Sequence, residues 1–121
     1  MTITQPTTFD TTALVRAIEA RDADAVVALY AGDAVLSIVD RDHPPSTPRT
    51  LTGASEIDHY YRELCGRNIE HRVSGLVSDG ETVAFQQDCR YPEGGRVVCL
   101  TVARLRDGRI HNQTLVQAWD D

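Results

Sequence analysis

The stretch that decides the fold is Ala28-Leu29-Tyr30-Ala31-Gly32-Asp33-Ala34-Val35. It closes a pair of short helical segments, because Gly32 is a typical helix terminator and a strand-like apolar run follows it. A third helical segment is expected after Gly53, and only strand-like segments come after that. Helices first and strands afterwards predict an α+β domain, with three N-terminal helices packed on a strongly curved antiparallel sheet. Such a sheet makes a cone, and its open end is a small-molecule pocket.

Helical periodicity and capping residues place the three helices. We expect Thr11 or Thr12 to cap the first helix, Asp24 the second and Ser55 the third, and Gly66 to end the third. The apolar face of the third helix is predicted at the spacing i, i+3, i+4 and i+7, which selects Ile57, Tyr60, Tyr61 and Leu64. Because Tyr60 and Tyr61 are neighbours, only one of them is expected to point fully inward.

Alternation in the later segments assigns each strand an inner and an outer face. The turns between them are expected at Asp79-Gly80, Pro92–Gly95 and Asp107-Gly108. The inner faces are predicted to carry Ile69, His71, Val73 and Val77; Val83, Phe85, Gln87, Cys89 and Tyr91; and Gln113, Leu115, Gln117 and Trp119. The outer face is then apolar at Leu76, Leu100, Val102 and Val116, which predicts a homodimer through the sheet.

Length and charge narrow the class of protein. The 121 residues fit a single domain over 11–121 after a flexible tail over 1–10. The net charge of −6 disfavours nucleic-acid and anionic-membrane partners, and all 12 basic residues are arginine, which excludes lysine-based catalysis. No apolar run is long enough for a membrane span, and Met1–Asp10 lacks the features of a signal peptide. With three cysteines at no metal-binding spacing, we expect reduced thiols and a cytoplasmic protein.

Three segments carry a family resemblance. Leu29–Val35, Leu51–Ile57 and Leu105–Ile110 resemble three characteristic segments of the NTF2-like superfamily, in its SnoaL-like group. The resemblance implies a cystatin-like cone with a pocket between the third helix and the sheet. It also implies a family of isomerases, polyketide cyclases, dehydratases, epoxide hydrolases and non-catalytic binding modules. Relative to ketosteroid isomerases, the catalytic positions fall near Ala17, at Thr101 and near Ile38, two residues before Asp40. Two of the three catalytic groups are therefore missing and the third is displaced, which argues against steroid isomerisation by that machinery.

Two residues are candidates for acid–base chemistry. His71 lies on an apolar strand face, and imidazole is suited to moving protons near neutral pH. Asp40 follows an apolar strand, where desolvation is expected to raise its pKa toward the working pH. Asp40 and His43 also form an Asp-x-x-His pair in the proline-rich loop, but no third ligand is evident for a metal. We therefore expect no metal and no cofactor.

Further side chains are predicted to contact a small hydrophobic ligand. Buried polar groups need a partner or a ligand, so polar side chains on apolar strand faces are candidates for binding. The set is Gln87, Thr101, Gln113 and Gln117, with Phe85, Tyr61, Trp119 and His43. Each also has a structural interpretation, such as a hydrogen bond between Gln87 and Gln113 across the sheet. Cys89 and Cys99 can line the pocket as small apolar groups, and only His71 is placed to activate them.

Three functions remain open at this point. The first is a cofactor-free cyclase, isomerase or dehydratase that acts by acid–base chemistry on a hydrophobic, polyketide-like carbonyl compound. The second is a non-catalytic binding or accessory module with the same pocket. The third is an epoxide hydrolase, which needs an Asp-Arg-Asp set in the cone; Asp88 and Arg90 are expected on the outer face, against that function.

Overall fold

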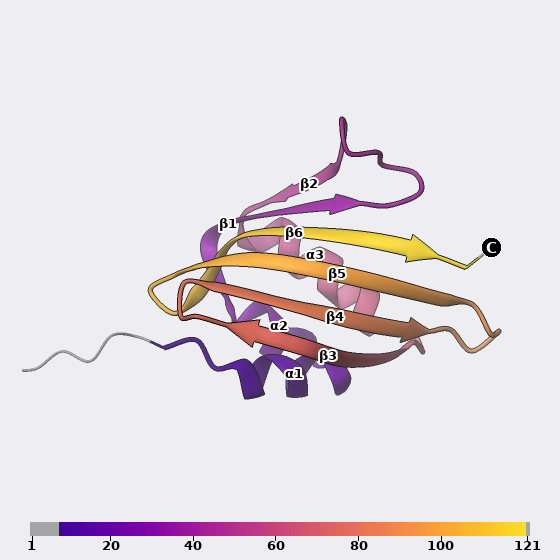
Figure 1. Ribbon diagram of the computed structural model, residues 1–121, viewed down its shortest axis with the longest axis horizontal. Helices are drawn as coiled ribbons and strands as arrows, with labels where there is room; N and C mark the ends of the chain where they lie inside the picture. The colour runs from indigo at the N-terminus through magenta and orange to yellow at the C-terminus, as the bar shows by residue number, and fades with distance from the viewer. Residues whose placement is uncertain (1–7, 121) are drawn as a thin grey trace, which may run out of the picture.

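The structure is a computed structural model that describes residues 8–120. Within that range, three helices lie against one face of a six-stranded sheet (Figure 1). The helices are α1 (Thr11–Glu19), α2 (Ala23–Val27) and α3 (Gly53–Cys65). The strands are β1 (Tyr30–Val39), β2 (Arg49–Thr52), β3 (Glu70–Ser78), β4 (Thr82–Arg90), β5 (Arg96–Arg106) and β6 (Arg109–Trp119). None of the helices in 8–120 is long and apolar enough to cross a membrane.

The sheet is mixed rather than wholly antiparallel. Its strand order is β2-β1-β6-β5-β4-β3, and β1 runs parallel to β6 while all other neighbours are antiparallel. The prediction of a purely antiparallel sheet is therefore wrong at β1 and β6. Alternation reveals which face a side chain occupies but carries no information on strand direction.

Aspartates, not the expected residues, begin the first two helices. Asp10 accepts a hydrogen bond from the backbone N–H of Ala13 at 2.9 Å, and Asp22 accepts one from that of Ala25 at 3.1 Å. The caps predicted at Thr11, Thr12 and Asp24 are wrong, since those residues lie inside helical turns. Asp and Ser or Thr are nearly equivalent caps, so a run of them leaves the first residue of the helix uncertain.

The start of the chain and the end of α2 also differ from the prediction. Residues 1–7 of the expected tail lie outside the described residues, but Phe9 is buried in the core. The second helix ends with its cap at Ala28, and Gly32 belongs to β1, so Gly32 does not terminate that helix. In α3 the expected cap Ser55 lies inside the helix; Thr52 precedes it, and Glu56 accepts the backbone N–H of Thr52 at 3.1 Å. The prediction that Gly66 follows the helix is confirmed.

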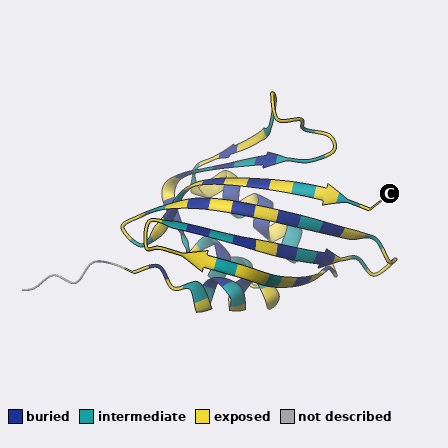
Figure 2. Ribbon diagram, viewed as in Figure 1, coloured by how far each residue is buried: buried dark blue, intermediate teal, exposed yellow. Residues whose placement is uncertain are grey.

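Burial alternates along β4, β5 and β6 as the sequence pattern predicts (Figure 2). The prediction fails at the end of β3, where Val77 is 65% exposed and Leu76 is half-buried. A register shift between Ser74 and Val77, with Gly75 at φ +61°, inverts the alternation there. The outer face of the sheet consequently exposes Val77, Leu100, Val102 and Val116.

Candidate active site

The strand register aligns inner-face side chains in rows across the sheet. One row runs from His71 through Cys89 and Val97 to Trp119, at the end of the sheet where β6 finishes. The neighbouring row is made by Val73, Gln87, Cys99 and Gln117. Two adjacent rows thus bring together polar side chains that are far apart in the sequence.

These rows face the helices across a cavity of about 50 Å³. Most of its lining is apolar or aromatic, from α1, α3 and the inner face of the sheet. Residues with a polar side-chain group also line it, and such a mixture with apolar residues is usual in a small-molecule site. They are His71, Gln87, Gln113, Gln117, Tyr30, Tyr60, Tyr61, Tyr91, Trp119, Cys65, Cys89 and Cys99.

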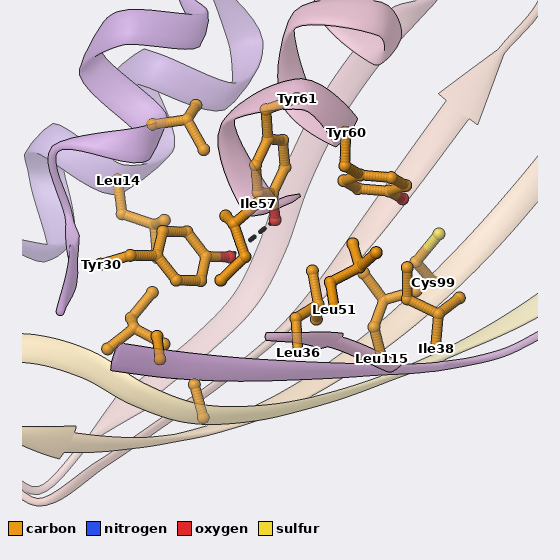
Figure 3. Close-up of a cluster of buried hydrophobic side chains, with 14 of the residues drawn as sticks. Leu14, Tyr30, Leu36, Ile38, Leu51, Ile57, Tyr60, Tyr61, Cys99 and Leu115 are labelled. Carbon is orange, nitrogen blue, oxygen red and sulfur yellow. Dashed lines mark hydrogen bonds between the residues drawn. The ribbon is translucent and has the colours of Figure 1, made fainter. Parts of the chain in front are cut away.

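A chain of hydrogen bonds crosses the deep side of the cavity. Tyr30 donates to Oε1 of Gln113, and the hydroxyls of Tyr30 and Tyr61 lie 2.6 Å apart (Figure 3). Because Oε1 only accepts, the proton of Tyr30 is used there and Tyr61 donates to Tyr30. Nε2 of Gln113 donates to Thr101 at 3.4 Å. Burial raises the pKa of both tyrosines, so they remain protonated donors.

Tyr60 differs from the other two tyrosines. Both Tyr60 and Tyr61 are buried, so the expectation that only one of them points inward is wrong. Their rings pack edge to face with their centroids 5.1 Å apart. Tyr60 reaches from α3 toward Cys99 (Figure 3). Tyr60 is one of the residues that line the cavity, and no hydrogen bond joins its hydroxyl to another described side chain. Burial raises its pKa, which keeps it a proton donor.

His71 is buried and held on one ring nitrogen. Its Nδ1 lies 3.2 Å from Sγ of Cys89 and 3.0 Å from Nε2 of Gln87. When the Gln87 amide or the Cys89 thiol donates to Nδ1, the ring proton sits on Nε2. When Cys89 is a thiolate, Nδ1 carries a proton and donates to sulfur, which leaves Nε2 as a base.

Cys89 and Cys99 are free thiols on adjacent strands. A hydrogen bond from Cys99 lowers the pKa of Cys89; burial opposes this, and the contact with His71 lowers it further. The same interaction and burial raise the pKa of Cys99. Of the two, Cys89 therefore ionises first, because both neighbours stabilise its thiolate.

The loop between β1 and β2 contacts the cavity-lining Trp119 through Arg41. Asp40 accepts the backbone N–H of Asp42 at 2.9 Å and lies 2.9 Å from Nδ1 of His43. Partial burial alone would raise the pKa of Asp40, but these hydrogen bonds hold it below its ordinary value, opposite to the expectation. Neither Asp40 nor His43 lines the cavity. Arg41 from this loop stacks on the ring of Trp119, 4.4 Å from its centre.

The structure brings most of the predicted site residues together. The prediction that Gln87 and Gln113 share the inner face with Phe85 and Trp119 is confirmed, and His71, Tyr61 and Gln117 line the same cavity. Thr101 is buried beneath it and accepts from Gln113. The hydrogen bond weighed between the two glutamines is not formed, since each has another partner. Whether these residues bind a substrate stays a prediction.

Sequence reasoning missed Tyr30 as a site residue and underrated Cys89. Tyr30 falls in the stretch that is expected to close the second helix, whereas it is the first residue of β1. The signal for Cys89 was present: it shares strand parity with Gln87, and the register puts it directly opposite His71. The stacking of Arg41 on Trp119 had no sequence signal, because it depends on the path of an irregular loop.

Solved structures share this arrangement over most of both chains. An NTF2-like protein of unknown function from Mesorhizobium loti superimposes with a TM-score of 0.77 at 14% identity, covering 88% of this chain and 86% of that one. A protein from Kribbella flavida assigned as a ketosteroid isomerase gives a TM-score of 0.73 at 19% identity, covering 91% of this chain and 74% of that one. IdmH from Streptomyces antibioticus, assigned as a polyketide cyclase, gives 0.65 at 24% identity, covering 88% and 87%. The fold is therefore NTF2-like.

The family follows from the sequence match. Residues 11–113 match the model of the SnoaL-like domain, and the chain belongs to that family. The resemblance drawn from the sequence is confirmed. No curated protein matches the chain.

Proposed function

We propose that the protein is a cofactor-free enzyme of the cyclase, isomerase or dehydratase type. Its substrate is a small hydrophobic carbonyl compound, and His71 moves a proton at the carbon next to the carbonyl. One observation carries the proposal: His71 is a buried imidazole in an otherwise largely apolar cavity, anchored at Nδ1 by Gln87 and Cys89. A general base needs this combination of fixed orientation and limited water.

Tyr60 is the proposed electrophilic partner. Proton removal next to a carbonyl places negative charge on the carbonyl oxygen, and a neutral donor lowers that barrier. Tyr60 lines the cavity and its raised pKa keeps the hydroxyl protonated, whereas the protons of Tyr30 and Tyr61 are used within the polar chain. Asp40 is the less favoured base, because it is held by His43 outside the cavity.

The alternatives receive less support. A non-catalytic binding module does not require a buried titratable group, but the inward position of His71 favours an enzyme. An epoxide hydrolase needs acidic residues inside, yet Asp88 forms an ion pair with Arg96 at 2.7 Å, on the face of β4 opposite to the cavity-lining Gln87 and Cys89.

The test is hydrogen–deuterium exchange next to the carbonyl of 2-tetralone, followed by NMR in deuterated buffer. The wild-type protein should accelerate exchange, and His71→Gln should lose about 10²–10⁴ of that acceleration. Asp40→Asn and addition of a chelator should have little effect. Full exchange activity in His71→Gln, or loss with chelator alone, would contradict the mechanism. No acceleration by a folded wild-type protein would favour the binding module.

A further inference from the structure

The side chains around Cys89 form a second reactive centre, distinct from proton transfer by His71. Cys89 lines the cavity and lies 3.2 Å from Nδ1 of His71, its cross-strand partner. Gln87 fixes the imidazole from the other side at 3.0 Å, and Cys99 sits diagonally across the β4–β5 pair. The thiol is thus flanked by a proton acceptor and by a second thiol.

These neighbours make Cys89 nucleophilic. His71 can take the proton of Cys89 on Nδ1 and then donate it back to the thiolate as a hydrogen bond. Both Cys99 and His71 favour the thiolate, as the lowered pKa of Cys89 reflects. A thiolate beside an imidazolium is the usual form of an activated cysteine.

The surroundings select the kind of electrophile. The walls near Cys89 are aromatic and aliphatic, including Tyr91, Val97 and Trp119, so a charged reagent is disfavoured. Tyr60 lines the same cavity, and its hydroxyl is a donor that suits a carbonyl oxygen. An apolar molecule that carries an electrophilic carbon conjugated to a carbonyl matches both features.

We propose that Cys89 forms a reversible covalent adduct with small α,β-unsaturated carbonyl compounds that enter the cavity. The proton of the thiol passes to His71, and the sulfur forms a bond to the β-carbon while the electron pair of the C=C bond moves toward the carbonyl oxygen. The imidazolium then returns the proton to the α-carbon. The net change is addition of S–H across the double bond, with no oxidant or reductant and no leaving group.

Cys65 provides an internal control. It lines the same cavity from α3, but burial raises its pKa, and no imidazole contacts it among the described residues. Cys65 is half-buried and Cys89 is buried, so access alone favours Cys65, and faster labelling of Cys89 would reflect its activation. At pH 6 a thiol of low pKa is mostly ionised, but its thiolate is intrinsically less nucleophilic than that of an ordinary thiol. Together these effects leave Cys89 about tenfold more reactive than an ordinary thiol at that pH.

The experiment treats the folded, pre-reduced and desalted protein with 2-cyclohexen-1-one and maps adducts by mass spectrometry between pH 6 and 8. Cys89 should react first, at a rate that changes little with pH, whereas an ordinary thiol gains about tenfold per pH unit below its pKa. Cys65→Ser should keep the adduct and Cys89→Ala should lose it. His71→Gln should restore a steep pH dependence at Cys89, which a mere packing role for His71 would not do.

Three outcomes would overturn the proposal. They are faster labelling of Cys65 or Cys99 than of Cys89, a pH profile of Cys89 parallel to that of Cys65, and no adduct on the folded protein when all three thiols label in urea. Both proposals use His71, but the readout here is the mass of an adduct on Cys89 rather than turnover, so failure of this proposal can be told apart from failure of the acid–base reaction. Circular dichroism of each variant separates loss of reactivity from loss of fold.

Discussion

The hydroxyl of Tyr30 joins β1, α3 and β6 through its hydrogen bonds to Tyr61 and Gln113. Tyr30→Phe would leave the buried Oε1 of Gln113 without its donor and Tyr61 without its acceptor. We expect a loss of about 1–3 kcal/mol in the free energy of unfolding, the cost of unpaired buried polar groups. Urea unfolding followed by circular dichroism measures it.

Tyr60→Phe is the matched control for that loss. It also removes a tyrosine hydroxyl, from the residue next to Tyr61, but no described side chain depends on that hydroxyl for a hydrogen bond. The expected change is within about 0.5 kcal/mol. Equal destabilisation by both substitutions would show that the hydrogen-bond chain contributes nothing specific.

Asp40 gives stability a pH dependence of known sign. Its pKa in the folded protein lies below the ordinary value of 3.8, so its contribution is present above that pH and is lost as the pH falls through the folded-state pKa. Asp40→Asn should cost about 0.5–1 kcal/mol at pH 7, as for a partly exposed pair, and the gap should narrow below pH 3.8. Thermal unfolding at pH 7 and pH 3 tests this, with Asp42→Asn, at an exposed neighbour, as the control. A stability difference between the wild type and Asp40→Asn that widens at acid pH would contradict the prediction.

For single residues, the sequence predicts which face of a strand a side chain occupies better than which residues it contacts. His71 and Gln87 were placed on the inner face by parity alone, because alternation is a local property of a strand. Their contact with Cys89 depends on the pairing of β3 with β4, and the position of Tyr30 depends on where α2 ends. Those facts arise from tertiary packing, which a single sequence does not display.

Among the elements, β3 depends on one glycine. Gly75 adopts φ +61° where the register shifts, and an added Cβ would meet nothing within 4 Å. Gly75→Ala should therefore cost about 1–2 kcal/mol from backbone strain alone. Gly32→Ala is the control, since it also meets no atom within 4 Å and lacks a positive φ; we expect a change near zero. Equal stability of both variants in urea would refute a strained bulge.

Strongly periodic elements were predicted well, and the irregular ones were not. Three hairpin turns and the inner faces of β4 and β6 follow from alternation and turn residues. The short strand β2 was missed because Arg49–Thr52 is too brief for a periodic signal and follows three prolines. The bulge in β3 was missed because a glycine in a strand does not reveal which way the register shifts.

On the scale of the whole molecule, the outer face of the sheet predicts a homodimer. Leu100 and Val102 on β5 are 57% and 55% exposed. Val116 pairs with Leu100 from the neighbouring β6, and Val77 on β3 lies across Ala84 of β4 from Val102. Burying such a surface against a second copy removes it from water. Light scattering at micromolar concentration should give twice the mass of one chain. Leu100→Asp should give a monomer, and Thr12→Asp, on α1, should not. A wild-type monomer would refute the prediction.

The parallel pairing of β1 with β6 has a consequence for synthesis on the ribosome. β1 leaves the exit tunnel early, yet the strand that joins it to β5 is the last to emerge. Until then, the apolar residues of β1 have only β2 and the helices as partners. The sheet is complete only when nearly the whole domain has been synthesised. A stalled or truncated nascent chain therefore exposes an unpaired strand edge that chaperones must cover.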